Sequence, residues 1–113
     1  MSSVKIGDVE YQVLPGHGTI VMFCERNNLE YWEFVDLFTN IDPQKLSLKF
    51  VKGLADFTLC MIERANKDVV LPDVYEIADW LGDMDNMLTV QKLIFGAYSK
   101  KVETTGENQE NSE

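Results

Sequence analysis

The sequence predicts a mainly α-helical domain of the small α+β type, in which an N-terminal β-hairpin precedes a compact bundle of about five helices around one long central helix. Apolar residues recur at three- and four-residue steps over most of the chain, whereas strict alternation is confined to the first thirteen positions. The last eleven residues contain no apolar side chain. We therefore expect one domain over residues 1–102 and a disordered acidic tail over residues 103–113.

The composition restricts the class of partner. Nineteen acidic residues against ten basic residues give a formal charge of −9, and this sign disfavours nucleic acid, because phosphates attract clustered Lys and Arg. No apolar run approaches a membrane span, so no membrane partner is expected. No signal peptide is recognisable, which favours a reducing, cytoplasmic setting. Cys24 and Cys60 are then more plausible as buried free thiols than as a disulfide.

The first predicted element is a β-hairpin over residues 4–13. Two alternating runs flank Gly7 and Asp8, and glycine at the first turn position suits a type II′ turn. Because a lone hairpin is marginal in water, its apolar side must lie on helices or pair with another chain. This side comprises Val4, Ile6, Val9, Tyr11 and Val13.

Two short helices are expected next, over residues 19–27 and 29–38. Asn27 and Asn28 supply the turn between them. His17, the only histidine, has no partner at a catalytic or metal-binding spacing and is interpreted as a loop residue. The second helix is rich in aromatic residues, so either it packs into the core or part of it stays exposed for a protein partner.

The central helix is expected between Asp42 and Ala65. Either Asp42 caps it, or it begins at Ser47 after a short turn. Its apolar positions cover more than half of its circumference, which requires several neighbouring elements. They form one stripe of Phe50, Val51, Leu54, Phe57, Thr58, Met61 and Ile62, and a second of Leu46, Leu48, Ala55, Leu59 and Cys60.

Two further helices are expected after residue 71. Pro72 suits the first position of one helix, and Gly82 ends it. Asp83 or Asp85 can cap the final helix, which we expect to extend to about Lys101.

The sequence contains none of the common catalytic motifs. The chain has no glycine-rich nucleotide loop and no HExxH, CxxC or GxSxG motif. Asp79, Asp83 and Asp85 can be considered as paired carboxylates, but capping already explains them, and the ligand spacing of a calcium loop is missing. We therefore expect a protein that is not an enzyme and has no catalytic, cofactor-binding or metal site.

Several local patterns resemble the tail assembly chaperones of long-tailed bacteriophages and prophages. VKIGDVEYQV resembles the hairpin of that family, with Ile6, Gly7 and Tyr11 matching, and MFCERNNLEYWEFVDLF resembles the first two helices, with Phe23 and Glu25 as counterparts. LSLKFVKGLADFTLCMIERAN and LPDVYEIADWLGD resemble the next two helices. The resemblance covers roughly residues 4–101, although each motif is short.

The resemblance implies a non-enzymatic assembly factor, made in the host cytoplasm and absent from the mature virion. Members of this family bind and solubilise the tape measure protein, a long apolar helical chain, and help to recruit tail tube subunits. The resemblance also implies a longer form made by programmed frameshifting, for which residues 99–101 are the natural place. The chain departs from the family pattern in the loop of residues 15–18 and at Pro72.

Binding to an apolar helical partner requires an apolar surface patch. The candidate partner-binding residues are Trp32, Phe38, Trp80, Met84 and Met87, with the alternative that all five belong to the core. The competing interpretation is an acidic adaptor or inhibitor that binds a basic host protein as a nucleic-acid mimic. Homo-oligomerisation stays open at this point.

Overall fold

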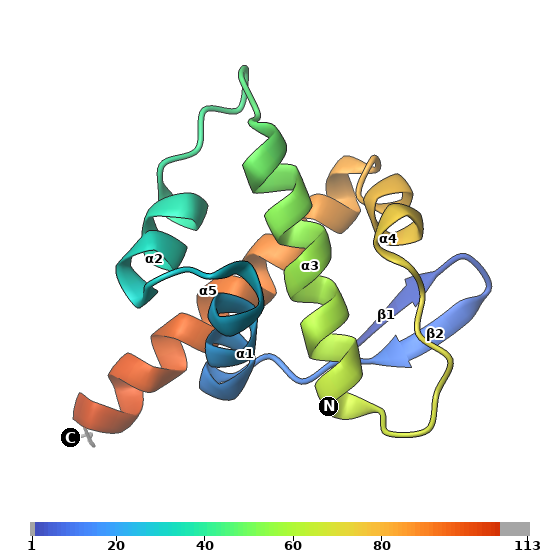
Figure 1. Cartoon of the computed structure of the whole chain (residues 1–113), viewed down its shortest axis with the longest axis horizontal. Helices are drawn as coiled ribbons and strands as arrows, with labels where there is room; N and C mark the ends of the chain where they lie inside the picture. Colours follow the sequence, from blue (N-terminus) through green and yellow to red (C-terminus); the bar gives the residue numbers. More distant parts are fainter. Residues whose placement is uncertain (1, 107–113) are drawn as a thin grey trace.

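The computed structural model describes residues 2–106, with side chains as far as Ser99. Within this range, two strands precede five helices, and the expected fold class is confirmed (Figure 1). The elements are β1 (Ser3–Ile6), β2 (Val9–Gln12), α1 (His17–Asn27), α2 (Tyr31–Thr39), α3 (Leu48–Ala65), α4 (Val74–Trp80) and α5 (Met84–Gly106). α5 continues beyond its expected end near Lys101, and the remainder of the predicted tail, residues 107–113, lies outside the described residues.

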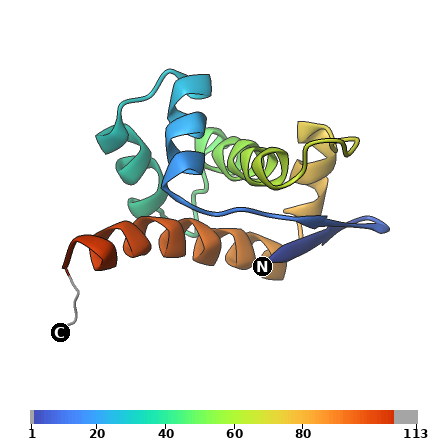
Figure 2. The same ribbon diagram turned by 90° about the horizontal axis from the view of Figure 1, so that it is seen from below.

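The long helix α3 lies at the centre of the molecule. Figure 1 shows α1 and α2 on one side of it and α4 with the hairpin on the other. α5 runs along one face of the molecule, and the other four helices all lie on the same side of α5 (Figure 2). α3 contacts all four other helices and β2, as expected for a central helix.

Ser47 sets the start of α3. Its hydroxyl accepts a hydrogen bond from the backbone N–H of Phe50 at 3.0 Å, so the second of the two predicted starts is confirmed. Asp42 instead accepts from the backbone N–H of Gln44 in the preceding turn. Phe50 in the first turn of α3 is buried against Phe38 of α2, with ring centroids 6.1 Å apart. Leu48 is two residues earlier, on nearly the opposite side of the helix, and is 82% exposed, so its predicted place in an inward stripe was wrong. The same correction applies to Leu46, which is exposed before the helix begins.

The core surrounds the middle and the end of α3. Phe57 lies on α3, with its ring centroid 5.8 Å from that of Phe23 on α1 and 5.9 Å from that of Phe34 on α2. These separations are the ones that aromatic pairs prefer. All three rings are buried, so they join α1, α2 and α3 into one apolar cluster.

The hairpin packs on helices of its own chain. Gly7 has a φ of +65° and Asp8 has no positive φ, which agrees with the predicted type II′ turn. The apolar side faces α3 and α4 and is buried, except that Val9 beside the turn is 48% exposed, which corrects the prediction for that residue. The backbone N–H of Leu14 donates to the carbonyl of Met61, which ties the end of the hairpin to α3.

Side-chain and backbone caps fix the remaining helix ends. Asn28, in the left-handed region with a φ of 55°, ends α1 as predicted. The Asp73 carboxylate caps α4, so Pro72 precedes the cap and does not occupy the first helical position as expected. The Asp83 carboxylate accepts from the backbone N–H of Asp85 and caps α5. His17 is the first residue of α1 and not a loop residue.

Candidate partner-binding groove

A groove of about 500 Å³ lies between α2 and α3, next to the end of α1. Phe23, Leu29 and Leu37 supply apolar side chains, and Trp32 stands at the edge. The complete lining is Phe23, Asn27, Leu29, Trp32, Glu33, Asp36, Leu37, Lys49, Lys52, Gly53 and Asp56. An apolar floor between charged flanks is the arrangement that receives one face of an amphipathic helix.

Gly53 determines how closely the two walls of the groove approach each other. A Cβ atom at this position would lie 3.1 Å from Cδ2 of Leu37 and 3.2 Å from Cζ of Phe38. Both distances are shorter than the roughly 3.5–4.0 Å of an ordinary carbon–carbon contact. Glycine therefore lets α2 pack directly on the backbone of α3.

Trp32 is exposed because of its position on α2. Phe34 and Phe38 are four residues apart, share the inner face of the helix, and have ring centroids 5.1 Å apart. Trp32 is two residues before Phe34, which places it on nearly the opposite side of a helix, and it is 69% exposed. Phe34 and Phe38 thus pack inward, as the first interpretation of this helix expected, whereas Trp32 has the exposure that the second interpretation requires.

The charged side chains of the groove are partly segregated by sign. Glu33 and Asp36 lie on the α2 wall, and the exposed Lys49 and Lys52 lie on the α3 wall together with the half-buried Asp56. Burial raises the pKa of the Asp56 carboxyl, although Lys52 acts to lower it. This pattern favours a partner helix with basic residues on the flank that faces α2.

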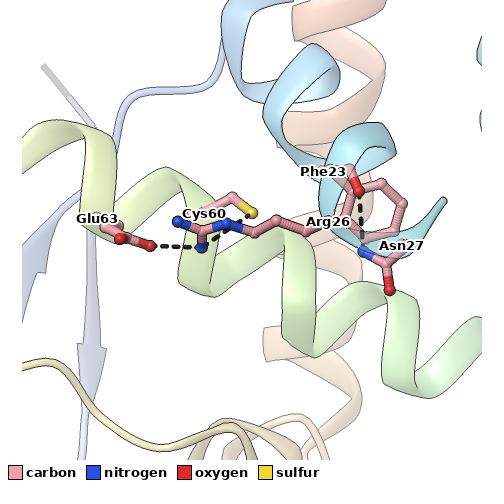
Figure 3. Close-up of polar contacts among 5 residues, drawn as sticks. All are labelled: Phe23, Arg26, Asn27, Cys60 and Glu63. Carbon is pink, nitrogen blue, oxygen red and sulfur yellow. Dashed lines mark hydrogen bonds and ion pairs between the residues drawn. The ribbon is translucent and has the colours of Figure 1, made fainter. Parts of the chain in front are cut away.

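A polar contact at one end of the groove fastens α1 to α3. The Arg26 guanidinium forms an ion pair with Glu63 and lies 4.0 Å from Sγ of Cys60 (Figure 3). Hydrogen bonding from Arg26 lowers the pKa of the Glu63 carboxyl. On the same turn of α1, the side-chain amide of Asn27 donates to the carbonyl of Phe23 at 2.9 Å, as Figure 3 also shows. The Arg26 contacts therefore join α1 to α3 beside the groove, whereas the Asn27 bond lies within α1 and closes its last turn.

The structure does not gather the five predicted partner-binding residues into one patch. Trp32 lines the groove, whereas Phe38 is half-buried beneath it. Met84, 61% exposed, and the half-buried Trp80 lie at the junction of α4 and α5, across α3 from α2 (Figure 1). Met87 is only 9% exposed and packs in the core, so its prediction as an accessible residue was wrong.

Most of the groove residues were not predicted from the sequence. Leu29, Leu37, Lys49, Lys52 and Asp56 come from separate elements, and only the packing of α2 on α3 brings them together. All five lie within stretches that resemble the chaperone family, but the resemblance assigns none of them a role. The exposed aromatic residue on α2 was the one feature of the groove that the sequence could indicate.

Both cysteines are free, as predicted, although Cys24 is half-buried and only Cys60 is buried. Burial raises the pKa of both thiols, which disfavours the reactive thiolate.

In residues 2–106, no group of three or more His, Cys, Asp or Glu side chains could hold a metal ion. Over the same range, no helix has the length and apolar character needed to cross a membrane. No protein-family model, curated protein or solved structure matches the chain.

Proposed function

We propose that the protein is a non-enzymatic tail assembly chaperone of a bacteriophage or prophage, which binds apolar helical segments of a tape measure protein. The observation that carries the proposal is the 69% exposed Trp32 beside the apolar floor of the α2–α3 groove. Tryptophan is enriched among the residues that dominate binding energy, and such residues occupy pockets that lose water on binding. The order of hairpin and helices agrees with the family that the sequence motifs resemble.

In this proposal, an amphipathic segment of the partner lays its apolar face against Leu29, Trp32 and Leu37. Glu33 and Asp36 attract basic residues on one flank of the segment and fix its orientation. A single contact of this size is modest, but contacts repeated along one long partner gain from avidity. The formal charge of −9 keeps the crowded complex soluble while tail tube subunits are recruited in the host cytoplasm.

Co-expression with the tape measure protein of the same phage genome tests this function. We expect the wild-type chain to keep the tape measure protein soluble and to co-purify with it at high salt, because apolar contacts are weakly screened. Trp32→Ala should abolish this effect. Tyr75→Ala is the matched control, because Tyr75 is 79% exposed and lies on α4, away from the groove.

Two outcomes would contradict the proposal. One is a tape measure protein that stays insoluble with the wild-type chain. The other is equal solubilisation by wild type and by Trp32→Ala. Strongly salt-sensitive capture of a basic host protein would favour the acidic adaptor instead.

A further inference from the structure

α5 carries a stripe of exposed apolar side chains on its outer face. Met84, Leu88 and Phe95 are 61%, 47% and 64% exposed. Together with Gln91 they follow steps of four, three and four residues, the heptad spacing that places side chains along one seam of a helix. Met87, Val90, Ile94 and Ala97 form the buried face of α5, which packs on the other four helices, all on one side of α5 (Figure 2). The seam lies a little more than a quarter turn around the helix from that face, and its Phe95 borders α2.

We propose that this seam pairs with the α5 seam of a second copy of the chain, in antiparallel orientation, to form a homodimer. The inference rests on α5 alone and does not depend on the proposed function.

The distribution of charge favours a second copy as the occupant. Residues 1–83 contain fourteen acidic and seven basic residues, whereas residues 84–102 contain one acidic and three basic residues. Over its whole length α5 contains two acidic and three basic residues, so its net charge does not repel another acidic chain.

Charge also selects the antiparallel orientation. Asp79, Asp83 and Asp85 surround the start of α5, and the sequence of its remaining part has three lysines, at positions 92, 100 and 101, against one glutamate, at position 103. Antiparallel pairing sets the acidic start of each helix beside the basic end of the other, whereas parallel pairing sets like charges together. A two-fold axis makes every such contact twice.

The heptad spacing gives the register. With Leu88 opposite Gln91 of the second copy, Met84 lies level with Phe95 of that copy. Asp85 then comes within about two residues, or about 3 Å along the axis, of the level of Lys92 in the other helix. The dimer thus contains two symmetric Asp85–Lys92 pairs.

A small apolar hollow lies beside Phe95. Val35 and Phe38 of α2 and Tyr98 of α5 line it. At about 20 Å³ it is too small to receive a side chain, so Met84 of the second copy, which lies opposite Phe95 in the proposed register, packs over it with its flexible thioether chain.

Sedimentation velocity of the full chain over a range of concentrations tests the dimer. We expect a monomer–dimer equilibrium that Asp85→Lys or Lys92→Asp weakens at least about tenfold, because each change turns two attractive pairs into repulsive ones. The double variant Asp85→Lys with Lys92→Asp restores the pairs and should return to within about threefold of wild type. Glu25→Lys makes the same charge change on α1 and should leave the equilibrium unchanged.

Phe95→Ala tests the apolar part of the seam without altering charge, and circular dichroism verifies that each variant is folded. We expect it, too, to weaken the dimer by about tenfold or more, as loss of a central apolar contact does. A wild-type chain that stays monomeric at millimolar concentration would overturn the proposal. So would a dimer that is insensitive to these changes, or a double variant no better than the single ones.

Discussion

Replacing Trp32 with alanine should separate binding from folding. A tryptophan side chain presents up to about 250 Å². With 69% of Trp32 exposed, about 80 Å² is buried in the free chain, which contributes at most about 2 kcal/mol to stability at 25 cal/mol per Å². Alanine is the better helix former by roughly 0.5 kcal/mol. We therefore expect Trp32→Ala to lower the free energy of unfolding by only about 1 kcal/mol.

The effect on binding should be larger. The exposed part of Trp32 amounts to about 170 Å², so full burial by a partner helix contributes up to about 4 kcal/mol. A loss of about 2–4 kcal/mol corresponds to a Kd about 30- to 800-fold weaker. Calorimetric titration with a synthetic amphipathic segment of the tape measure protein measures the affinity, urea unfolding measures the stability, and Tyr75→Ala is the control for both.

Either measurement on Trp32→Ala, the affinity or the free energy of unfolding, can contradict the binding role of Trp32. A Kd within about threefold of wild type would mean that the partner does not cover Trp32. A loss of about 3 kcal/mol or more in unfolding free energy, the range for a buried aromatic residue, would mean that the indole is structural.

Three further predictions concern the groove and the helix that follows it. Gly53→Val should force Leu37 and Phe38 away from α3 and lower the free energy of unfolding by about 1–3 kcal/mol, measured by urea titration. Asp56→Asn should raise the free energy of unfolding at pH 7, because burial raises the pKa of this carboxyl above its usual 3.8, so that its ionisation destabilises the folded chain. The gain should vanish below pH 3.8, where the carboxyl is protonated in the folded and in the unfolded chain. A gain that persists at pH 3 would contradict this cause. Asp73→Ala removes the acceptor of two backbone N–H bonds at the start of α4 and should cost about 1 kcal/mol in thermal unfolding, whereas Asp73→Asn should retain most of that.

Local signals predicted the elements well because each acts within a few residues. As predicted, Ser47 caps the start of α3 through its hydroxyl, and Asn28 ends α1 in the left-handed region. Gly7, which has no side chain, adopts the positive φ of the hairpin turn. The spacing of apolar residues showed which face of a helix is apolar, but it could not show which part of that face the neighbouring helices cover. Leu48 fits the second apolar stripe predicted for α3 and is nevertheless exposed, because α2 covers only the side of the first turn that carries Phe50.

The candidate site could be predicted only in part, since it depends on packing between elements. The high aromatic content of α2 suggested a binding surface. The sequence could not show that Trp32 is exposed and Phe38 half-buried, because this depends on which face of α2 contacts α3. Met87 was misplaced for the same reason, because it shares the buried side of α5 with Val90 and Ile94. The groove itself exists because Gly53 lets two helices approach, and no single segment encodes that contact.

The indole N–H signals of Trp32 and Trp80 offer the most direct test of the groove, because the chain contains only these two tryptophans. Trp80 is half-buried at the end of α4, across α3 from the groove, and so reports on the opposite side of the molecule. On titration with the tape measure segment in an NMR experiment, we predict that the Trp32 signal shifts and the Trp80 signal stays in place. Binding that moves the Trp80 signal and leaves Trp32 unchanged would show that the partner docks elsewhere.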